Sequence, residues 1–276
     1  MNDLLPLDAV RLACSDLGIA APGEIKLDGE IHRYHDSDHD KSGDKNAWYK
    51  AVDNGDGTAG GSVGHWRLQL KKNWFTGKMK TFTPEERQRH AQEQAERRRQ
   101  AVMKREQLHM EAAETARRSW KRTVSADPRN EYLTRKGVKA HGARQFDSTL
   151  VIDYRHPDGK ISTLQFIRPD GSKRFLANGQ ITGCYHRIGG RPDETITLVE
   201  GFATGATIHE ATGYPVAVCG SAGNLKPVAL SLRQKFPHII ILVCGDADPV
   251  GMAKAQEAAE EVSGYAVFPQ FPGVKP

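Results

Sequence analysis

Two stretches in the last third of the chain decide the fold: T-I-T-L-V-E-G at residues 195–201 and I-I-I-L-V-C-G-D-A-D at residues 239–248. Each is a short apolar run that ends in a glycine and acidic residues. Such runs are typical of strands buried on both faces, as in parallel sheets. Helix-length segments alternate with them, which predicts an α/β fold in which helices flank a parallel sheet. The expected strands are 195–199, 216–218, 238–243 and 265–268, and the expected helices are 203–211, 226–235 and 251–262.

Acidic side chains follow two of these strands. Glu200 ends the first, and Asp246 and Asp248 follow the third with one residue between them. Ligands of parallel sheets bind at the carboxyl ends of the strands. If the two strands are neighbours, three carboxylates meet in one cleft, where they repel one another unless cations neutralise them. Mg²⁺ or Mn²⁺, which prefer oxygen ligands, are the expected ions. The alternative is that these residues are helix caps and solvated loop acids.

Glycines accompany the acidic residues. Gly201 and Gly245 are expected to leave room for a bound phosphate. The G-S-A-G-N turn at residues 220–224 precedes the expected helix 226–235 and would present backbone N–H groups to an anion.

Composition bounds the class of protein. The chain has 276 residues, 38% hydrophobic and 26% charged, and this length suggests two domains, with room for a small third piece. Collagen-like and wholly disordered classes are excluded. The sequence has no apolar run of membrane-spanning length, and Asp3 and Asp8 argue against a signal peptide. The four cysteines form no C-x-x-C pair, which argues against a disulfide framework and a zinc ribbon. We therefore expect a cytoplasmic protein.

Charge is unevenly distributed along the chain. Residues 81–122 carry a net charge of +4 and residues 123–192 carry +6, whereas residues 193–276 carry −4. A basic middle joined to an acidic C-terminal part suits a protein that holds a polyanion beside metal ions. Two solvated surfaces of opposite sign are the alternative.

The first 80 residues predict a small α+β module. A helix is expected over 4–18, a hairpin over 24–32 with its turn at Asp28-Gly29, and a second hairpin from 47–52 to 64–70. Trp48, Trp66 and Trp74 lie among basic residues, a pattern that suits binding of unpaired bases. The other interpretation is that these tryptophans form the core of the module.

The segment His32–Asp44 is rich in histidine and aspartate, which raises the possibility of a metal site. It lacks the glycine and the final glutamate of a calcium loop, and it has no cysteines for zinc. A solvated polar loop is the favoured interpretation.

Residues 83–122 predict a long helix. T-P-E-E at 83–86 is a capping box with proline at the first helical position, and the residues that follow are rich in Glu, Gln, Arg and Ala, with few large apolar residues before Leu108. Such a helix buries little surface and is expected to link modules. A domain boundary is expected near residues 125–128.

Residues 126–192 predict short strands over 150–154, 161–167 and 174–176, separated by P-D-G turns. Basic residues cluster at the turns and strand ends of this segment. They are Arg168, Lys173, Arg174 and Arg187.

Three motifs carry a family resemblance. V-E-G at 199–201 followed by G-D-A-D at 245–248 resembles the Toprim domain of primases, topoisomerases and some nucleases. E-G-F-A-T-G at 200–205 resembles the E-G-Y-A-T motif of conjugative-plasmid and satellite-phage primases. Y-L-T-R-K-G-V at 132–138 is similar to their entry segment, and K-R-F-L at 173–176 and G-C-Y at 183–185 to their basic subdomain. The resemblance covers residues 125–270 well and residues 1–80 only loosely.

The resemblance implies a metal-dependent nucleotidyltransferase that makes short primers on single-stranded DNA from nucleoside triphosphates, by a two-metal mechanism in plasmid or phage replication or conjugation. It implies that Glu200, Asp246 and Asp248 hold Mg²⁺ or Mn²⁺ and that the glutamate moves protons. It also implies that basic residues bind template and nucleotide, a role assigned to Arg168, Lys173, Arg174, Arg187 and Lys226.

The implied organisation has four parts along the chain. Residues 1–80 form the small module, 81–124 the charged helical linker, 125–192 the basic β-rich subdomain and 193–276 the Toprim catalytic domain.

The chain departs from the family pattern in two respects. It has no cysteines for the N-terminal zinc ribbon of many relatives, and it ends soon after the last Toprim strand. It also has no G-x-x-x-x-G-K-[ST] loop, so a separate helicase is the expected source of unwinding. A truncated piece of a longer protein fits these departures.

Two other functions use the same residues. A Toprim nuclease would hydrolyse a phosphodiester in the same cleft, and a replication accessory protein would bind single strands without catalysis. The carboxylates do not separate the first of these from a primase; the basic β segment favours synthesis.

Overall fold

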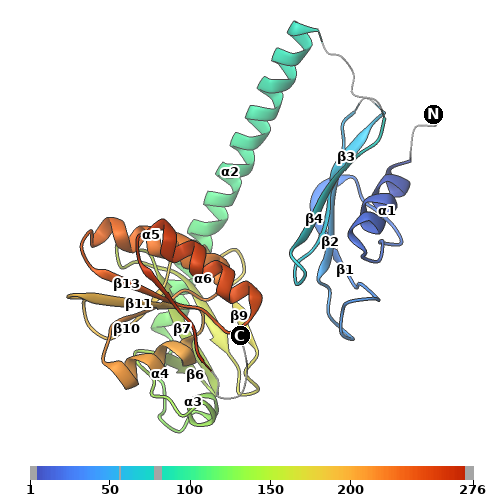
Figure 1. Cartoon of the computed structure of the whole chain (residues 1–276). Coiled ribbons are helices and arrows are strands. Elements are labelled where there is room, and N and C mark those ends of the chain that lie inside the picture. Colours follow the sequence, from blue (N-terminus) through green and yellow to red (C-terminus); the bar gives the residue numbers. More distant parts are fainter. Residues whose placement is uncertain (1–4, 56, 78–82, 271–276) are drawn as a thin grey trace. The chain divides into compact units, whose positions relative to one another are not determined.

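The computed structural model describes residues 5–55, 57–77 and 83–270. The chain divides into two compact units, Met1–Ala91 and Gln92–Pro276, and each is described by itself (Figure 1). The strands and helices expected within residues 195–268 all form, and each end lies within two residues of its expected position.

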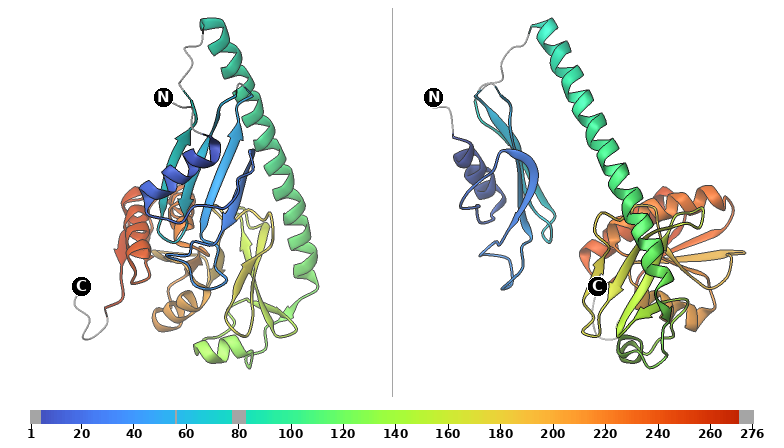
Figure 2. Two further views of the ribbon diagram at one scale, coloured as in Figure 1. Left: turned by 90° about the vertical axis from the view of Figure 1, so that its right-hand side faces the viewer. Right: turned by 180° about the vertical axis from the view of Figure 1, so that it is seen from behind.

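The first unit is an antiparallel sheet with one helix. The strands β1 (Asp28–Tyr34), β2 (Ala47–Asp53), β3 (Ala59–His65) and β4 (Leu70–Phe75) lie in chain order. Helix α1 (Pro6–Leu17) packs on one face of this sheet (Figure 2). The core between them holds buried residues of the helix and of three strands: Val10, Ala13, Cys14, Tyr49, Val63 and Trp74.

The first expected hairpin is wrong. Asp28-Gly29 is not a turn but the start of β1, where the pairing with β2 shifts between Asp28 and Ile31. Gly29 has φ +77°, a conformation that glycine adopts readily and that suits a β-bulge. The Asp28-Gly29 pair therefore lies at a β-bulge within a strand, not at a hairpin turn. The second hairpin is confirmed in its first strand only: β2 pairs with β3, but β3 begins at Ala59 within the expected loop, and most of the expected strand 64–70 is the turn before β4, which adds a further strand at the edge.

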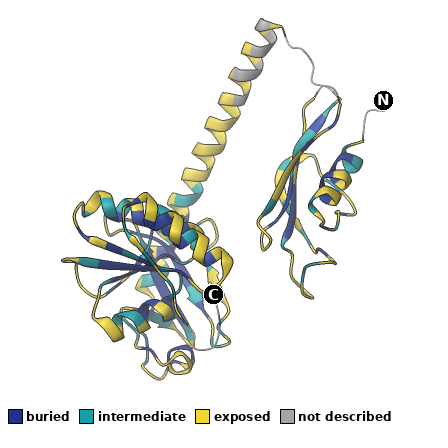
Figure 3. Ribbon diagram, viewed as in Figure 1, coloured by how far each residue is buried: buried dark blue, intermediate teal, exposed yellow. Residues whose placement is uncertain are grey.

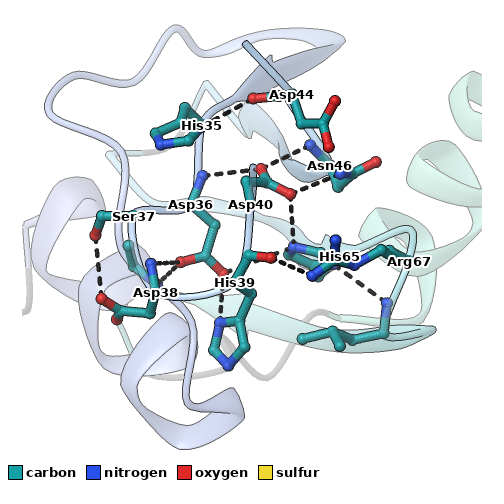
Figure 4. Close-up of polar contacts among 12 residues, drawn as sticks. His35, Asp36, Ser37, Asp38, His39, Asp40, Asp44, Asn46, His65 and Arg67 are labelled. Atoms are coloured by element: carbon teal, nitrogen blue, oxygen red, sulfur yellow. Dashed lines mark hydrogen bonds and ion pairs between the residues drawn. The ribbon is translucent and has the colours of Figure 1, made fainter. Parts of the chain in front are cut away.

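The histidine- and aspartate-rich segment after β1 is a loop with mostly exposed residues, but Asp36 and Asp40 within it are not solvated, so the prediction of a solvated loop is correct only in part. The side chains of Asp36, Asp40 and His65 have no exposed surface. They point toward one another together with His39 (Figure 4). The Nδ1 atom of His39 lies 2.9 Å from Asp36 Oδ2. Sequence reasoning missed this cluster because His65 is on β3, far along the chain from the aspartates.

Hydrogen bonds satisfy both carboxylates of this cluster. Asp36 Oδ1 accepts from the backbone N–H groups of Ala20 (3.2 Å) and Asp38 (3.1 Å). Asp40 accepts from the backbone of Asp36 and from the backbone and side chain of Asn46, at 2.6–3.0 Å. Burial by itself would raise both pKa values, but these bonds and the neighbouring histidines hold the pKa of each aspartate below its usual value.

The Nδ1 atom of His65 accepts a hydrogen bond from the backbone N–H of Leu68 at 3.2 Å, which leaves a proton on Nε2. That Nε2 atom lies 3.4 Å from Asp40 Oδ1 and 3.7 Å from Asp36 Oδ2. The ring nitrogen therefore lies near two carboxylates but makes no hydrogen bond to either, and the cluster places the loop after β1 against β3.

Helix α2 (Pro84–Lys121) confirms the predicted long helix. Most of its described side chains are exposed, and it is buried only near its C-terminal end (Figure 3). There Ala116 and Trp120 pack against Val151 and Leu164. In the described part of the chain, no helix is both long and apolar enough to cross a membrane.

The second unit contains two sheets. The first sheet is antiparallel, in the order β5-β6-β7-β8-β9. Its strands and the helix between the first two are β5 (Val124–Ser125), α3 (Glu131–Lys136), β6 (Arg144–Phe146), β7 (Thr149–Arg155), β8 (Ile161–Ile167) and β9 (Lys173–Phe175). One face packs against the end of α2. The other face, with Leu150, Ile152 and Tyr154, packs against the second sheet.

The second sheet confirms the predicted parallel α/β arrangement. Its order is β10-β12-β11-β13-β14, and all strands are parallel except β10, which runs antiparallel to β12. The strands are β10 (His186–Ile188), β11 (Thr195–Val199), β12 (Val216–Val218), β13 (Ile240–Cys244) and β14 (Tyr265–Val267).

Helices cover both faces of this second sheet. Helix α4 (Phe202–Thr212) packs on the face that also meets the antiparallel sheet. The short 3₁₀ turn η1 (Ala222–Asn224) leads into α5 (Leu225–Lys235), which covers the opposite face together with α6 (Pro249–Glu261). Because Val199 and Phe202 share a core with Tyr154 and Ile152, the two sheets of the unit are packed as one body.

Candidate active site

The carboxyl ends of β11 and β13 meet at one edge of the parallel sheet. The two strands are direct neighbours, with Val199 opposite Cys244. Glu200 follows Val199, and Asp246 comes two residues after Cys244. The prediction that these strands are adjacent is confirmed, and their pairing brings the acidic residues to the same edge.

Glu200 feels the other two carboxylates. It is half-buried, and its pKa is raised first by that burial and then by the negative charges of Asp246 and Asp248. A hydrogen bond from the backbone N–H of Ala222 and the charge of Lys173 act in the opposite direction without reversing the shift. The three acids therefore form one electrostatic group that its surroundings do not fully neutralise.

Asp248 has a second task in the fold. Its Oδ1 atom accepts hydrogen bonds from the backbone N–H groups of Val250 (3.0 Å) and Gly251 (2.8 Å), so it is the N-cap of α6. This fixes the loop of residues 245–248 at the start of the helix. The helix-cap alternative is thus correct for Asp248, and its negative charge still raises the pKa of Glu200.

The donor set suits a hard divalent cation, since it consists of carboxylate oxygens that repel one another. Within the described ranges, no three histidine, cysteine, aspartate or glutamate side chains are arranged as a ready-made group of metal ligands. Mg²⁺ sites commonly use one or two carboxylates and are completed by water and substrate phosphates. The residues therefore fit an ion that arrives with its substrate better than a closed protein cage.

Lys173 brings a positive charge to these acids. It lies on β9 of the antiparallel sheet, and a Cβ atom added at Gly201 would lie 3.7 Å from its Nζ atom. Partial burial and the like charge of Lys136 lower the pKa of Lys173, while Asp246 and Glu200 raise it. A lysine from one sheet thus faces the acids of the other.

The comparisons with known proteins agree with this geometry. Residues 195–269 match the Toprim domain family. The chain contains a Toprim domain. Over 289 residues the chain is 32% identical to a DNA primase TraC of Escherichia coli, an alignment that covers 96% of this chain and 26% of that protein. A second DNA primase TraC of Escherichia coli is 28% identical over 282 residues, covering 96% of this chain and 19% of that protein.

The chain therefore spans about a quarter or less of the length of these curated relatives. Among solved structures, the primase fragment of the bacteriophage T7 primase-helicase protein aligns with a TM-score of 0.39 and 22% identity, over 54% of this chain and 64% of that one. The DnaG catalytic core aligns with a TM-score of 0.37 and 11% identity, over 56% of this chain and 66% of that one.

Of the five basic residues assigned to nucleic acid or nucleotide, Lys173 is the one whose pKa is affected by Glu200 and Asp246. Arg174 follows it on β9 and, because side chains alternate along a strand, faces the α2 side with Phe166. Arg168 lines a cavity of about 400 Å³ with Arg122 and Phe146. Arg187 is exposed on β10, at the edge of the parallel sheet.

Lys226 is occupied by protein partners. Its Nζ atom lies 2.6 Å from Glu261 Oε2 and 3.6 Å from Glu257 Oε1, both on α6. These contacts raise its pKa. Its charge is therefore already compensated within the Toprim domain.

The glycines of the Toprim motifs differ in their roles. A Cβ at Gly245 would lie within 2.9 Å of Ala255 and Gly251, so this glycine permits close packing of α6. A Cβ at Gly205 would lie 2.9–3.2 Å from Val199, Val216 and Val218, so that glycine permits close packing of α4. At Gly201 a Cβ would make only ordinary contacts, with Lys173 Nζ at 3.7 Å and Thr204 Oγ1 at 3.8 Å, so close packing does not require a glycine there.

Sequence reasoning missed two contributors to the site. Lys136, at the end of α3, lies close enough to lower the pKa of Lys173. Its position in the K-G pair of residues 136–137 was a visible signal. The Asn224 side chain fixes the turn at 220–224: its Nδ2 donates to the carbonyls of Cys184 (2.9 Å) and Cys219 (2.7 Å), and its Oδ1 accepts from Gly183 N–H (2.8 Å).

Proposed function

We propose that this chain is the catalytic part of a DNA primase that synthesises short primers on single-stranded DNA by metal-dependent nucleotidyl transfer. The observation that carries the proposal is the meeting of Glu200, Asp246 and Asp248 with Lys173 in a Toprim domain. The similarity to DNA primases TraC over 96% of the chain supports it. Service to a plasmid or phage replicon, in replication or conjugation, belongs to the same proposal, as does a separate helicase partner.

The three carboxylates would hold Mg²⁺ or Mn²⁺. When bound, the ion would supply positive charge against the triphosphate and the attacking 3′ oxygen. Asp246 contributes its charge beside Glu200, and Asp248 holds the loop through the N-cap of α6. Gly201 has no side chain between Glu200 and Lys173, so a phosphate could approach its backbone.

Two further roles belong to side chains of this site. Lys173 is suited to bind and orient a phosphate, because its ammonium faces the acids from the other sheet. Glu200 is suited to accept a proton, because burial and neighbouring negative charge raise its pKa. Positioning and charge would then supply most of the acceleration.

A direct test incubates the chain with single-stranded DNA, nucleoside triphosphates and Mg²⁺ or Mn²⁺. New short oligomers are expected from the wild type and none from Asp246→Asn. Asp193→Asn, an exposed aspartate ahead of β11, is the matched control and should keep synthesis. Shortened template DNA in place of new oligomers would indicate a nuclease, and steep salt-dependent binding without turnover would indicate an accessory protein.

Binding of the ion can be read without activity. Mn²⁺ titrated into the wild-type chain should bind, and Asp246→Asn should weaken that binding while leaving binding of single-stranded DNA intact or stronger. Equal Mn²⁺ affinity in both chains would remove Asp246 from the proposed set of ligands.

A further inference from the structure

The sheet of the first unit has a second face, opposite α1. Three cross-strand rows occupy it, read from β1 to β4. The first row is Arg33, Trp48, Gly64 and Lys71, and the second is Ile31, Lys50, Ser62 and Asn73. The third is Asp28, Val52, Gly60 and Phe75. We call these three rows the open face.

Aromatic rings lie over the glycines of β3 on the open face. A Cβ added at Gly64 would lie 2.7 Å from the ring of Trp48, and one added at Gly60 would lie 3.1 Å from the ring of Phe75. The two glycines are four residues apart, a distance of about 13 Å along a strand. The rings therefore stand apart along a strip of backbone that carries only the small side chain of Ser62 between them.

Trp66 extends the aromatic surface outward. It follows β3 in the turn before β4 and stacks on Trp48, with ring centroids 5.1 Å apart and an interplanar angle of 26°. Trp66 is 50% exposed and Phe75 is 45% exposed, whereas Trp48 beneath is buried. The position of Trp48 is explained by its packing over the strand glycine Gly64. This does not explain Trp66, which stacks on the outer face of Trp48.

The charged side chains in the first two rows of the open face are all positive. Arg33, Lys50 and Lys71 are exposed, and the first two rows contain no acidic residue. The acid of the third row, Asp28, contacts the ring of His32, with both oxygens 2.9 Å from Nε2. A ligand on this face would meet ring faces and cations.

We propose that the open face binds single-stranded DNA, with bases stacked on Trp66 and Phe75 and phosphates neutralised by Lys50 and Lys71. Stacked rings interleaved with cations suit single strands because unpaired bases expose their ring faces, which a duplex does not. The cationic rows complement the charge of the DNA backbone. The ligand is the template of the proposed function, and the inference rests on that function for its biological setting only.

The charge half of the proposal is tested by salt dependence, using the full chain and fluorescent oligo(dT). Each phosphate contact on a single strand contributes about 0.7 to the slope of log affinity against log salt. Lys50→Ala with Lys71→Ala should reduce that slope by about 1.4. Lys72→Ala is the matched control, since Lys72 is adjacent in sequence but pairs with Asp16 of α1 on the other face (2.6 Å). Its slope should equal that of the wild type.

The stacking half is tested by Trp66→Ala, which should weaken oligo(dT) binding about 5- to 150-fold. Trp66→Phe should recover most of the affinity, because a smaller ring still stacks. Circular dichroism and the thermal unfolding midpoint check that each variant is folded. An unchanged slope in the double lysine variant together with unchanged affinity in Trp66→Ala would overturn the proposal. Equal binding of duplex DNA with the same dependence on Lys50 and Lys71 would overturn it as well.

The outcome is separable from that of the proposed function. Asp246→Asn should lose primer synthesis and keep the affinity for oligo(dT) that depends on Trp66. If the chain makes primers but the open-face substitutions leave oligo(dT) binding unchanged, only the proposed binding surface is overturned. A chain that makes no primers but whose binding depends on Trp66 and Lys71 would overturn only the primase proposal.

Discussion

Two acidic groups, one in each unit, differ in how the fold treats their charge. Asp36 and Asp40 in the first unit are fully buried in their side chains, yet their pKa values are lowered because backbone amides, Asn46 and histidines surround them. Glu200 in the Toprim domain is only half-buried, yet its pKa is raised. Burial alone thus does not predict the direction of the shift; the partners do.

The difference separates a structural cluster from a candidate site. The first unit supplies its aspartates with donors from Ala20, Asp38 and Asn46, so no external cation is needed. The Toprim domain holds Glu200 against Asp246 and leaves the repulsion in place. An acid that its own fold leaves uncompensated is a better candidate for ligand binding than one that is deeply buried and satisfied.

The largest expected effect is on activity. Glu200→Gln should lower primer synthesis by roughly 1,000-fold, because it removes charge from the place where the ion and phosphates would bind. The same variant should unfold no more easily than the wild type, since the repulsion from Asp246 is relieved. Synthesis assays and thermal unfolding measure the two effects, with exposed Glu194→Gln as control. Retained synthesis would remove Glu200 from the site.

The next effect is on the stability of the first unit. Asp36→Asn should lower its free energy of unfolding by about 3 kcal/mol, because the donors that now face the carboxylate lose a charged acceptor within a buried cluster. Denaturant unfolding followed by fluorescence of the buried Trp48 and Trp74 reports on this unit. Asp38→Asn, an exposed neighbour, is the control. Equal stability of the two variants would contradict the structural role assigned to Asp36.

A smaller effect is expected from substituting two lysines of the Toprim site region, Lys173 and Lys226, which differ in whether protein acids already pair with them. Lys173→Ala should lower primer synthesis about tenfold or more, because an unshared cation is removed from the acids. Lys226→Ala should cost less than about 1 kcal/mol of stability, the range of exposed ion pairs, and should affect synthesis far less. The two variants are compared by their rates of primer synthesis at equal DNA concentration. An equal loss of synthesis in both would contradict the conclusion that the charge of Lys226 is compensated by α6.

The smallest effect is on pH dependence, and its sign is opposite in the two groups. Because the folded pKa of Glu200 is raised, its contribution to stability grows as pH falls through that pKa and is lost as pH rises through it. The pKa of Asp36 is lowered from 3.8, so its contribution is present above that value and is lost as pH falls through the lowered pKa. Unfolding of the wild type, Glu200→Gln and Asp36→Asn across roughly pH 3 to 7 should show these opposite differences. Parallel curves for all three chains would contradict both assignments.

The sequence predicted the parallel sheet well because its strands are short apolar runs that end in distinctive polar residues. That Glu200, Asp246 and Asp248 lie at one edge could be predicted for the same reason: strand ends of one parallel sheet lie at one edge. The choice among five basic residues could not be made, because a charge in sequence does not reveal which face of a strand it occupies. Lys173 and Arg174 are adjacent in the chain and lie on opposite sides of β9.

The two failures in the first unit have a common physical cause. Whether Asp28-Gly29 is a turn or a bulge depends on pairing with β2, and whether Asp36 is solvated depends on His65 and Ala20. Local patterns contain no information about partners that tertiary contacts bring in. Long-range pairing therefore overrode both local signals.

Strand β10 has a consequence for how the Toprim domain can be isolated. It lies outside the family match of residues 195–269, yet it pairs with β12 and closes that side of the parallel sheet. A fragment cut at the family boundary would uncover the backbone of β12 and expose Val199 and Phe202, which pack against the antiparallel sheet in the whole unit. Such a fragment should aggregate. A fragment for expression should therefore begin upstream of β7, and the boundaries of the Toprim match are a poor guide for shortening this protein.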